Sequence, residues 1–269
     1  MNSYKSSPKI GARCSIDSSA FLSPFAKLGN DCRIGSESKL LGRVELGNHV
    51  WIDSNVMLYG TVRVGNRAYV GSNSTLGHFD RKTLTRMMTE TSIGGVTPSG
   101  RLEIGEDCIV RQGCTIYSSV RIGSKVEFGH NVVVRENTRI GARTMIGTGV
   151  VIDGDSSVGR DVSIQTGVYI SRCCKVADRV FLGPRCVLLN DKYMMLKKPK
   201  LVGPVIGTGS AIGGNATIMP GVKIGKKTVV GAGSVVNCNV PDETVYVGVP
   251  ARRLKATPKD WRLLLSSHR

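Results

Sequence analysis

One aliphatic side chain recurs at every sixth residue along most of this chain. The run is unbroken from Ile104 to Leu188, where fifteen successive sixth positions hold Ile, Leu, Val or Phe. The same spacing covers twelve positions from Ile10 to Leu76 and six from Ile206 to Val236. A period of six fits neither the 3.6-residue turn of a helix nor the two-residue alternation of an ordinary strand. It predicts a ribbon that coils and returns to one interior line.

A second regular position lies four residues after each aliphatic, and it is always small or β-branched. This predicts an interior pair of one large and one small side chain in every repeat. The residue directly after the aliphatic is often glycine, such as Gly105 and Gly123, which we interpret as a corner that needs positive φ.

Six of the eight cysteines occupy the small interior slot, and the sequence has no C-x-x-C pair. We therefore interpret these six as core filler and expect no metal site. They are Cys14, Cys32, Cys108, Cys114, Cys174 and Cys186.

The period, the interior pair and the glycines together resemble the hexapeptide-repeat acyltransferases. The resemblance implies an all-β fold, a left-handed parallel β-helix with 18 residues to the coil. Its handedness comes from the resemblance alone, because the spacing does not fix it and crossovers generally prefer the right hand. We expect a single β-helix domain over residues 1–256, two external loops at about 78–103 and 189–205, and a tail over 257–269.

Two breaks and one start signal locate the features outside the coil. The phase of six is lost between Leu76 and Ile104, which predicts the first loop, with about one helical turn. The span 189–205 keeps the phase but would turn Lys200 inward, so we expect it to leave the coil as well. The segment Thr257–Asp260 has an N-cap, a proline and a carboxylate in order, which predicts a short C-terminal helix through Leu265.

The net charge of +17 indicates an anionic partner. From Asp191 to Arg269 there are 13 Lys or Arg against four Asp or Glu. With 5% aromatic residues and no stacking platform, this charge favours a diphosphate-bearing small molecule over nucleic acid. No apolar run is long enough to span a membrane, and the polar start is unlike a signal peptide, so we expect a cytoplasmic protein.

From Gly129 onward, segments such as GHNVVVREN, VFLGPRCVLLNDKY and VYVGVPAR are similar to acetyl-CoA-dependent N-acetyltransferases. Those enzymes act on the amine of dTDP- or UDP-linked amino sugars, and the resemblance also implies a homotrimer with its sites between subunits. It departs at Met194, where relatives carry proline. The resemblance places the sugar at Gln165, Thr166, Asn190, Asp191 and Tyr193, and acetyl-CoA at Gly213, Asn215, Gly231, Ala232, Lys226, Lys227, Arg252 and Arg253.

Catalysis needs a neutral amine and a way to remove its proton. Positions 18 apart stack, so His130, Thr148 and Thr166 form one outward column, and His130 is our candidate base. The alternative is that solvent or the thioester sulfur takes the proton. We expect Asn190 and Asp191 to act in catalysis, with Asp191 holding the amine as ammonium; the alternative for both is a role in the loop's turn.

Two other functions stay open. The first loop loosely resembles that of the first-step acyltransferase of lipid A synthesis, so transfer to a hydroxyl or from an acyl carrier protein is an alternative. A non-enzymatic scaffold is the third.

Overall fold

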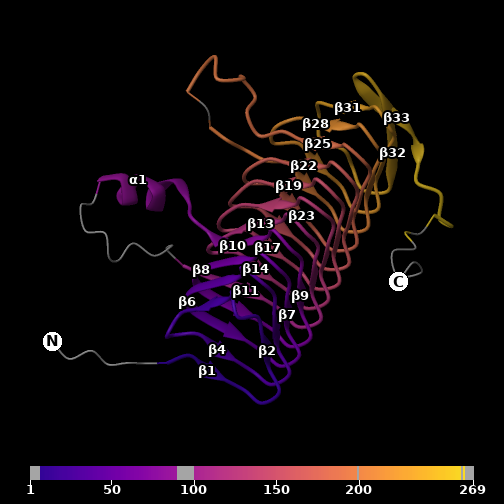
Figure 1. Ribbon diagram of the computed structural model, residues 1–269. Helices are drawn as coiled ribbons and strands as arrows, with labels where there is room; N and C mark the ends of the chain where they lie inside the picture. Colours follow the sequence, from indigo (N-terminus) through magenta and orange to yellow (C-terminus); the bar gives the residue numbers. More distant parts are fainter. Residues whose placement is uncertain (1–6, 90–99, 199, 262, 264–269) are drawn as a thin grey trace. The chain divides into compact units, whose positions relative to one another are not determined.

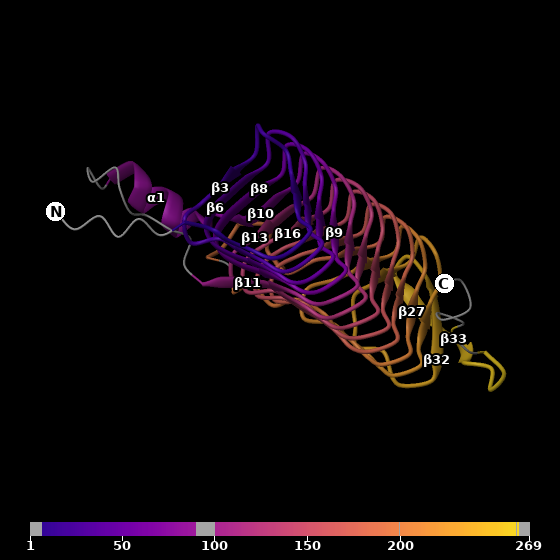
Figure 2. The ribbon, with the colours of Figure 1, turned by 60° about the horizontal axis from the view of Figure 1, so that its bottom comes forward.

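The computed structural model describes residues 7–89, 100–198, 200–261 and 263. The chain forms two compact units, residues 1–137 and 138–269. Each unit is built of very short parallel strands joined by tight turns (Figure 1), and Figure 2 shows successive coils lying one on the next within each unit. The predicted all-β, left-handed parallel β-helix is confirmed.

In the first unit each interior aliphatic lies beside the one a coil further on, as when Leu40 pairs with Leu58. The hydrophobic pattern fixes this register, because a slip by one residue would turn every aliphatic outward. The strands are β1 (Lys9–Ile10), β2 (Ser15–Ile16), β3 (Phe21–Leu22), β4 (Lys27–Leu28), β5 (Arg33–Ile34), β6 (Lys39–Leu46), β7 (Trp51–Ile52), β8 (Met57–Val64), β9 (Tyr69–Val70), β10 (Thr75–His78), β11 (Arg101–Ile104), β12 (Ile109–Val110), β13 (Thr115–Tyr117), β14 (Arg121–Ile122), β15 (Glu127–Phe128) and β16 (Val133–Val134).

The second unit repeats the same register, as when Ile164 pairs with Leu182. Its strands are β17 (Arg139–Ile140), β18 (Met145–Ile146), β19 (Val151–Ile152), β20 (Ser157–Val158), β21 (Ser163–Ile164), β22 (Tyr169–Ile170), β23 (Lys175–Val176), β24 (Phe181–Leu182), β25 (Val187–Leu188), β26 (Val205–Ile206), β27 (Ala211–Ile212), β28 (Thr217–Ile218), β29 (Lys223–Ile224), β30 (Val229–Val230), β31 (Val235–Val236), β32 (Thr244–Gly248) and β33 (Ala251–Ala256).

The small interior slot also provides hydrogen bonds to the turns. The Ser38 hydroxyl donates to the Asp53 carbonyl at 2.6 Å and accepts from the Val56 amide at 3.0 Å. The Cys108 thiol donates in the same way to the Gly123 carbonyl, 3.2 Å away. Because buried polar groups need partners, this slot suits Ser, Thr and Cys as well as Val. The predicted filler role is confirmed for the cysteines that are buried, Cys32, Cys108, Cys114, Cys174 and Cys186, while Cys14 is half-buried.

The glycines that follow the aliphatics do not have positive φ, so our interpretation of them is wrong. They are needed because coils approach closely at that position: a Cβ on Gly105 would lie 2.5 Å from the Ser124 nitrogen. The left-handed residue comes two positions later and often has a side chain, as at Asp107 and Arg143, both with φ of 57°.

Both predicted excursions are present. The span Leu58–Val64 pairs with the ends of the span Leu76–Ile104, so six residues in one coil are matched by 28 in the next. In the second unit the span Ile170–Val176 pairs with the ends of Leu188–Ile206. Residues 189–205 therefore leave the coil even though they keep the sixfold phase.

The first excursion contains α1 (Arg81–Thr89), a nine-residue helix that is longer than the single turn we predicted. Asp80 caps its start, because its carboxylate accepts a hydrogen bond from the Thr83 amide at 2.7 Å.

The predicted C-terminal helix is absent from residues 257–261, while Leu265 lies outside the described residues. Instead, β32 continues the stack beside β30 and forms an antiparallel hairpin with β33. Thr257 does not cap a helix: its amide donates to the Glu243 carbonyl at 2.8 Å and its hydroxyl to the Lys227 carbonyl at 3.0 Å. Backbone pairing to the last coil therefore outweighs the local helix signal.

We expect Gly105→Ala to lower the free energy of unfolding by about 1–3 kcal/mol, because the new Cβ overlaps the backbone of the next coil. The matched control is Gly209→Asn, at a residue with φ of 73° whose nearest contact for a Cβ is 3.6 Å away. Asparagine tolerates this conformation. Denaturant unfolding followed by circular dichroism checks the difference, and equal loss in both variants would contradict the close-approach explanation.

Candidate functional site

Five turns of the second unit stack into one edge, which we call the glycine edge: residues 147–149, 165–167, 183–185, 213–215 and 231–233. They follow β18, β21, β24, β27 and β30. Backbone amides join successive turns through bonds of 2.9–3.0 Å: Gly167 to the Thr148 carbonyl, Arg185 to Thr166, Asn215 to Pro184 and Gly233 to Gly214. Thr148 and Thr166 thus lie in adjacent turns, as their 18-residue spacing predicts.

The glycine edge brings together most of the predicted substrate and cofactor residues of this unit. These are Gln165 and Thr166 for the sugar, and Gly213, Asn215, Gly231 and Ala232 for acetyl-CoA. Thr166 is exposed, and the Gln165 side chain donates to the Ser163 hydroxyl at 2.8 Å.

The surface of this edge is bare backbone. A Cβ on Gly213 would lie 2.4 Å from the Ala232 nitrogen, so the turns touch through main-chain atoms. A Cβ on Gly149 or Gly233 would meet no atom within 4 Å, so space lies open outside these two residues. Such an edge can hold an extended, unbranched ligand chain against exposed peptide groups.

The second excursion starts from the other end of β25, beyond the face that separates it from the glycine edge. The Asn190 side-chain amide donates to the Arg172 carbonyl at 3.0 Å, and the Asn190 carbonyl accepts from the Val202 amide at 2.9 Å. Asn190 therefore holds both ends of the excursion on the coil. Asn190 and Thr166 lie in turns on opposite sides of β25 and are not brought together.

Asp191 folds the first turn of the excursion. Its two carboxylate oxygens accept from the backbone amides of Tyr193 and Met195, each at 2.9 Å. The Tyr193 ring is 44% exposed and lies 5.8 Å from the Lys192 ammonium and 5.2 Å from that of Lys197. The geometry shows the loop-turn role directly, and a substrate role for Asp191 or Tyr193 stays a prediction.

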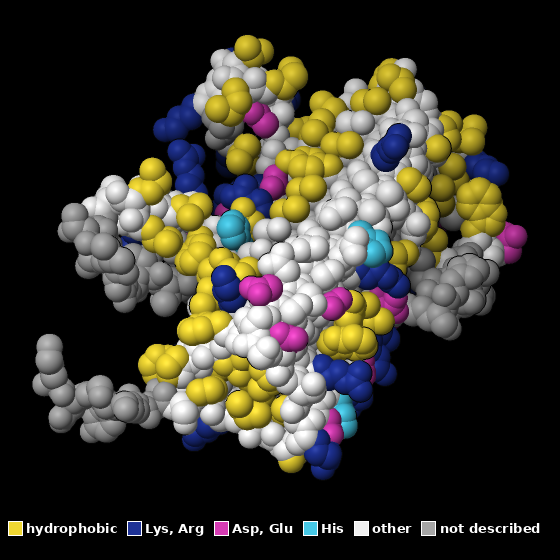
Figure 3. All heavy atoms as spheres, in the orientation of Figure 1, with side chains coloured by type: hydrophobic (Ala, Val, Ile, Leu, Met, Phe, Trp, Pro, Cys, Tyr) yellow, Lys and Arg dark blue, Asp and Glu magenta, His cyan; other side chains and the backbone are white. Residues whose placement is uncertain are grey.

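The tip of the second excursion is apolar and exposed. Figure 3 shows hydrophobic side chains on this lobe, where Met194, Met195 and Leu196 are 75–82% exposed.

The predicted phosphate-binding cations lie away from the glycine edge. Lys226 and Lys227 follow β29, one strand before Gly231. Lys227 pairs with Glu243 at 3.3 Å, and both side chains are more than 60% exposed, so water competes strongly for this pair. Arg252 and Arg253 lie on β33, where the Arg252 guanidinium donates to the Ala251 carbonyl at 3.0 Å.

His130 belongs to the first unit, in the half-buried turn that follows β15. The next residue, Asn131, has φ of 56°, and its amide donates to the Gln112 carbonyl at 3.0 Å. The place of His130 in a column with Thr148 and Thr166 stays a prediction.

A second histidine of the first unit has the surroundings of a base, and we passed over it in the sequence. His78 ends β10, its ring meets the Tyr117 ring edge-on at 4.9 Å, and the Arg135 guanidinium lies 5.5 Å from the far ring of Tyr117. The His78 Nδ1 is buried, with no hydrogen-bond partner among the described residues. Burial lowers the pKa of His78, which keeps its imidazole neutral near pH 7.

The sequence did contain a signal for this cluster. Tyr59, Tyr117 and Arg135 each follow directly after an interior aliphatic, where many coils have glycine. Large side chains in that slot mark the turns around which the first excursion starts.

The chain matches the family model described as bacterial transferase hexapeptide (six repeats) over residues 43–78, 119–154 and 203–238. These segments contain the sixfold aliphatic positions of both units.

Curated relatives are acetyltransferases by name. A lipopolysaccharide biosynthesis O-acetyl transferase, WbbJ of Escherichia coli (strain K12), so named provisionally, is 49% identical over 19% of this chain and 26% of its own length. The 2,3,4,5-tetrahydropyridine-2,6-dicarboxylate N-acetyltransferase of Clostridium perfringens (strain SM101 / Type A) is 42% identical over 29% of this chain and 31% of its own. The chain spans less than half the length of the curated relatives it matches.

Among solved structures, an Arabidopsis UDP-N-acetylglucosamine acyltransferase is 16% identical, with a TM-score of 0.49 over 93% of this chain and 71% of that one. PerB of Caulobacter crescentus, solved with CoA and GDP-perosamine, is 21% identical, with a TM-score of 0.39 over 64% of this chain and 89% of that one.

Among the described residues, no helix has the length and apolar composition needed to cross a membrane. The matched repeats and the coil geometry make this chain a member of the bacterial transferase hexapeptide family.

Proposed function

We propose that this protein is an acetyl-CoA-dependent N-acetyltransferase that acts on the amine of a dTDP- or UDP-linked amino sugar. The observation that carries the proposal is the glycine edge, where predicted sugar and acetyl-CoA residues lie in consecutive turns. The named acetyltransferase relatives support the reaction type.

The bare backbone of the edge suits the donor. Turns spaced by about 4.8 Å from coil to coil offer peptide groups at regular intervals to an extended pantetheine arm. When bound, acetyl-CoA supplies a thioester whose carbonyl carbon the sugar amine attacks. The exposed Thr166 hydroxyl, three turns from Ala232, can orient the sugar.

The proton of the attacking amine has two candidate acceptors in the first unit. His130 is the one that the family resemblance favours. His78 is favoured by its burial, because a neutral imidazole is the form that accepts a proton. In the second unit, the Asn190 Oδ1 accepts no hydrogen bond from the described residues and can receive one from the substrate amine. Asp191 keeps a second lone pair on each carboxylate oxygen for the ammonium form.

The exposed apolar tip of the second excursion supports assembly. Met194, Met195 and Leu196 give another copy of the chain a hydrophobic surface to cover, as a homotrimer with sites between subunits would require. Since acetyl-CoA is the donor, the proposal places the reaction in the cytoplasm.

A second candidate is acetyl transfer to a hydroxyl. The name of the Escherichia coli relative as an O-acetyl transferase favours it, and the same edge would hold the same donor. An acyl-carrier-protein donor or a non-enzymatic scaffold has no comparable support. Assay of a panel of nucleotide amino sugars and their hydroxyl analogues for CoA release decides between the two acceptors.

Gly233→Asn should raise the KM for acetyl-CoA by about tenfold, because the side chain fills the open space outside the glycine edge. Gly209→Asn is the matched control, since both glycines have left-handed φ, 69° and 73°, and Gly209 lies in a turn after β26. Steady-state kinetics at saturating sugar measures the effect. Equal KM in the two variants would remove the edge as the donor site.

The histidine variants identify the proton acceptor. We expect His130→Ala or His78→Gln to lower kcat by at least about 100-fold, the usual contribution of a general base. A loss below about tenfold in both, near 1.4 kcal/mol, would favour solvent or the thioester sulfur as acceptor.

Burial of His78 also predicts a dependence of stability on pH. The neutral form is favoured in the folded protein, so its pKa lies below the unfolded value of about 6.5. Its contribution is fully present above that value and is lost as pH falls through the folded pKa, because the unfolded chain binds the proton more readily. From pH 7 to pH 5 the wild type should therefore lose more stability than His78→Gln. Parallel losses in urea unfolding at the two pH values would show that His78 does not contribute.

A further inference from the structure

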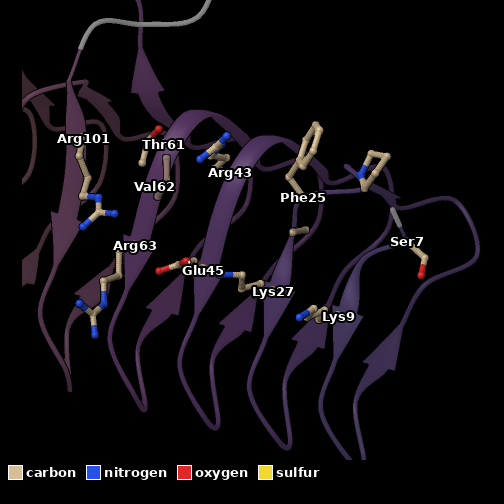
Figure 4. A pocket seen from close by; sticks show the side chains of 12 residues that line it. Ser7, Lys9, Phe25, Lys27, Arg43, Glu45, Thr61, Val62, Arg63 and Arg101 are labelled. Carbon is tan, nitrogen blue, oxygen red and sulfur yellow. Dashed lines mark hydrogen bonds and ion pairs between the residues drawn. The ribbon is translucent and has the colours of Figure 1, made fainter. Parts of the chain in front are cut away.

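A pocket of ≈ 360 Å³ lies on one face of the first unit, away from every residue of the glycine edge. Figure 4 shows its side chains, which come from the start of β1, β4, β6, β8, β11 and the turn before β4. Its size is at the lower end of the range for small-molecule sites.

Two columns of outward side chains form the floor of the pocket. Lys9, Lys27, Glu45 and Arg63 occupy equivalent positions on adjacent parallel strands. Arg43, Thr61 and Arg101 form the second column, two residues earlier on their strands. Adjacent strands lie about 4.8 Å apart, so the side chains of neighbouring strands can reach one ligand.

Three guanidinium groups surround the Thr61 hydroxyl. Arg43 lies one strand before it, Arg101 one strand after it, and Arg63 two residues along the same strand. Arginine forks match the oxygen geometry of a phosphate, and a hydroxyl adds a further donor. The group as a whole is therefore arranged to receive several oxygens of one anion.

Two carboxylates face these cations. Glu45 accepts from the Lys27 ammonium at 3.0 Å, and Glu103, at the border, lies 3.5 Å from the Arg101 guanidinium. Lys27 and then the charges of Arg101 and Arg63 hold the pKa of Glu45 below its usual range. Five cations against one lining carboxylate leave an excess of positive charge, and Arg43 and Arg63 have no hydrogen-bonded carboxylate among the described residues.

The rim of the pocket on the side of the turn before β4 is apolar. Pro24 and Phe25 form it, and the Phe25 ring is 57% exposed. An exposed aromatic face beside a cluster of arginines suits a ligand that joins a flat ring to a phosphate.

We propose that this pocket binds a phosphate ester with a planar ring, with its phosphates among Arg43, Arg63 and Arg101 and its ring on Phe25. The site is additional to the acetyl-transfer site, since it shares no residue with the glycine edge or the second excursion.

Titration calorimetry at low salt with two probes, inorganic pyrophosphate and uridine diphosphate, tests the site. Arg63→Gln should weaken binding of both probes by about tenfold, the effect of losing a hydrogen bond to a charged group. Phe25→Ser should weaken uridine diphosphate alone, because pyrophosphate has no ring. Glu45→Gln should tighten both probes, since it removes the carboxylate that faces the phosphates.

Lys39→Gln is the matched control: Lys39 is an exposed cation on the same strand as Arg43 and does not line the pocket. Its binding should stay within twofold of wild type, and circular dichroism should show that all four variants are folded. An equal loss in Lys39→Gln and Arg63→Gln would reduce the site to diffuse surface charge and overturn the proposal. So would weaker binding in Glu45→Gln, no effect of Arg63→Gln, equal effects of Phe25→Ser on both probes, or no binding of either probe to the wild type.

Discussion

The structure depends on how closely one turn lies on the next. At the turns the coils approach until main-chain atoms meet, with a Cβ on Gly213 only 2.4 Å from the next coil's backbone nitrogen, and the turn amides donate across this contact. The aliphatic repeat fills the interior, but the peptide contact fixes the spacing and direction of every coil. An edge of a β-helix is thereby turned into exposed backbone at a regular interval. The same contact that stabilises the fold supplies the surface on which we place the acetyl donor.

The excursions add what the repeat lacks. Outward strand residues stand in straight columns, so a coil alone offers flat faces and shallow pockets such as the one around Thr61. Chain that leaves the coil can bring polar groups to an edge from above. Asn190 shows how such a segment is secured, because its backbone and side chain both bond to residues of the coil or of the returning strand. Rigidity at the base and exposure at the tip are thus built into the same loop.

The sequence predicted the fold in detail because its signal is periodic and every repeat confirms the others. Lys200 even exposed an excursion that keeps the phase, since a lysine cannot occupy the aliphatic line. Single positions were less predictable. Gly105 was assigned to a conformation when its role is proximity to another coil, and that coil is 18 residues away. Thr257 has the residue types of a helix start, but its hydrogen bonds go to Glu243 and Lys227, which no local pattern shows.

Candidate site residues divide along the same line. Thr166 and Ala232 could be placed on one edge by counting, because the turns between them obey the repeat. The surroundings of His78 could not, since its neutrality comes from burial against Tyr117, a residue 39 positions away across an excursion of variable path. Asp191 is intermediate: its motif is visible in the sequence, but only the structure shows two backbone amides on its carboxylate. A carboxylate that shapes its own loop can still bind an amine, and the two roles are then coupled, because moving the side chain toward substrate would loosen the turn that positions Tyr193.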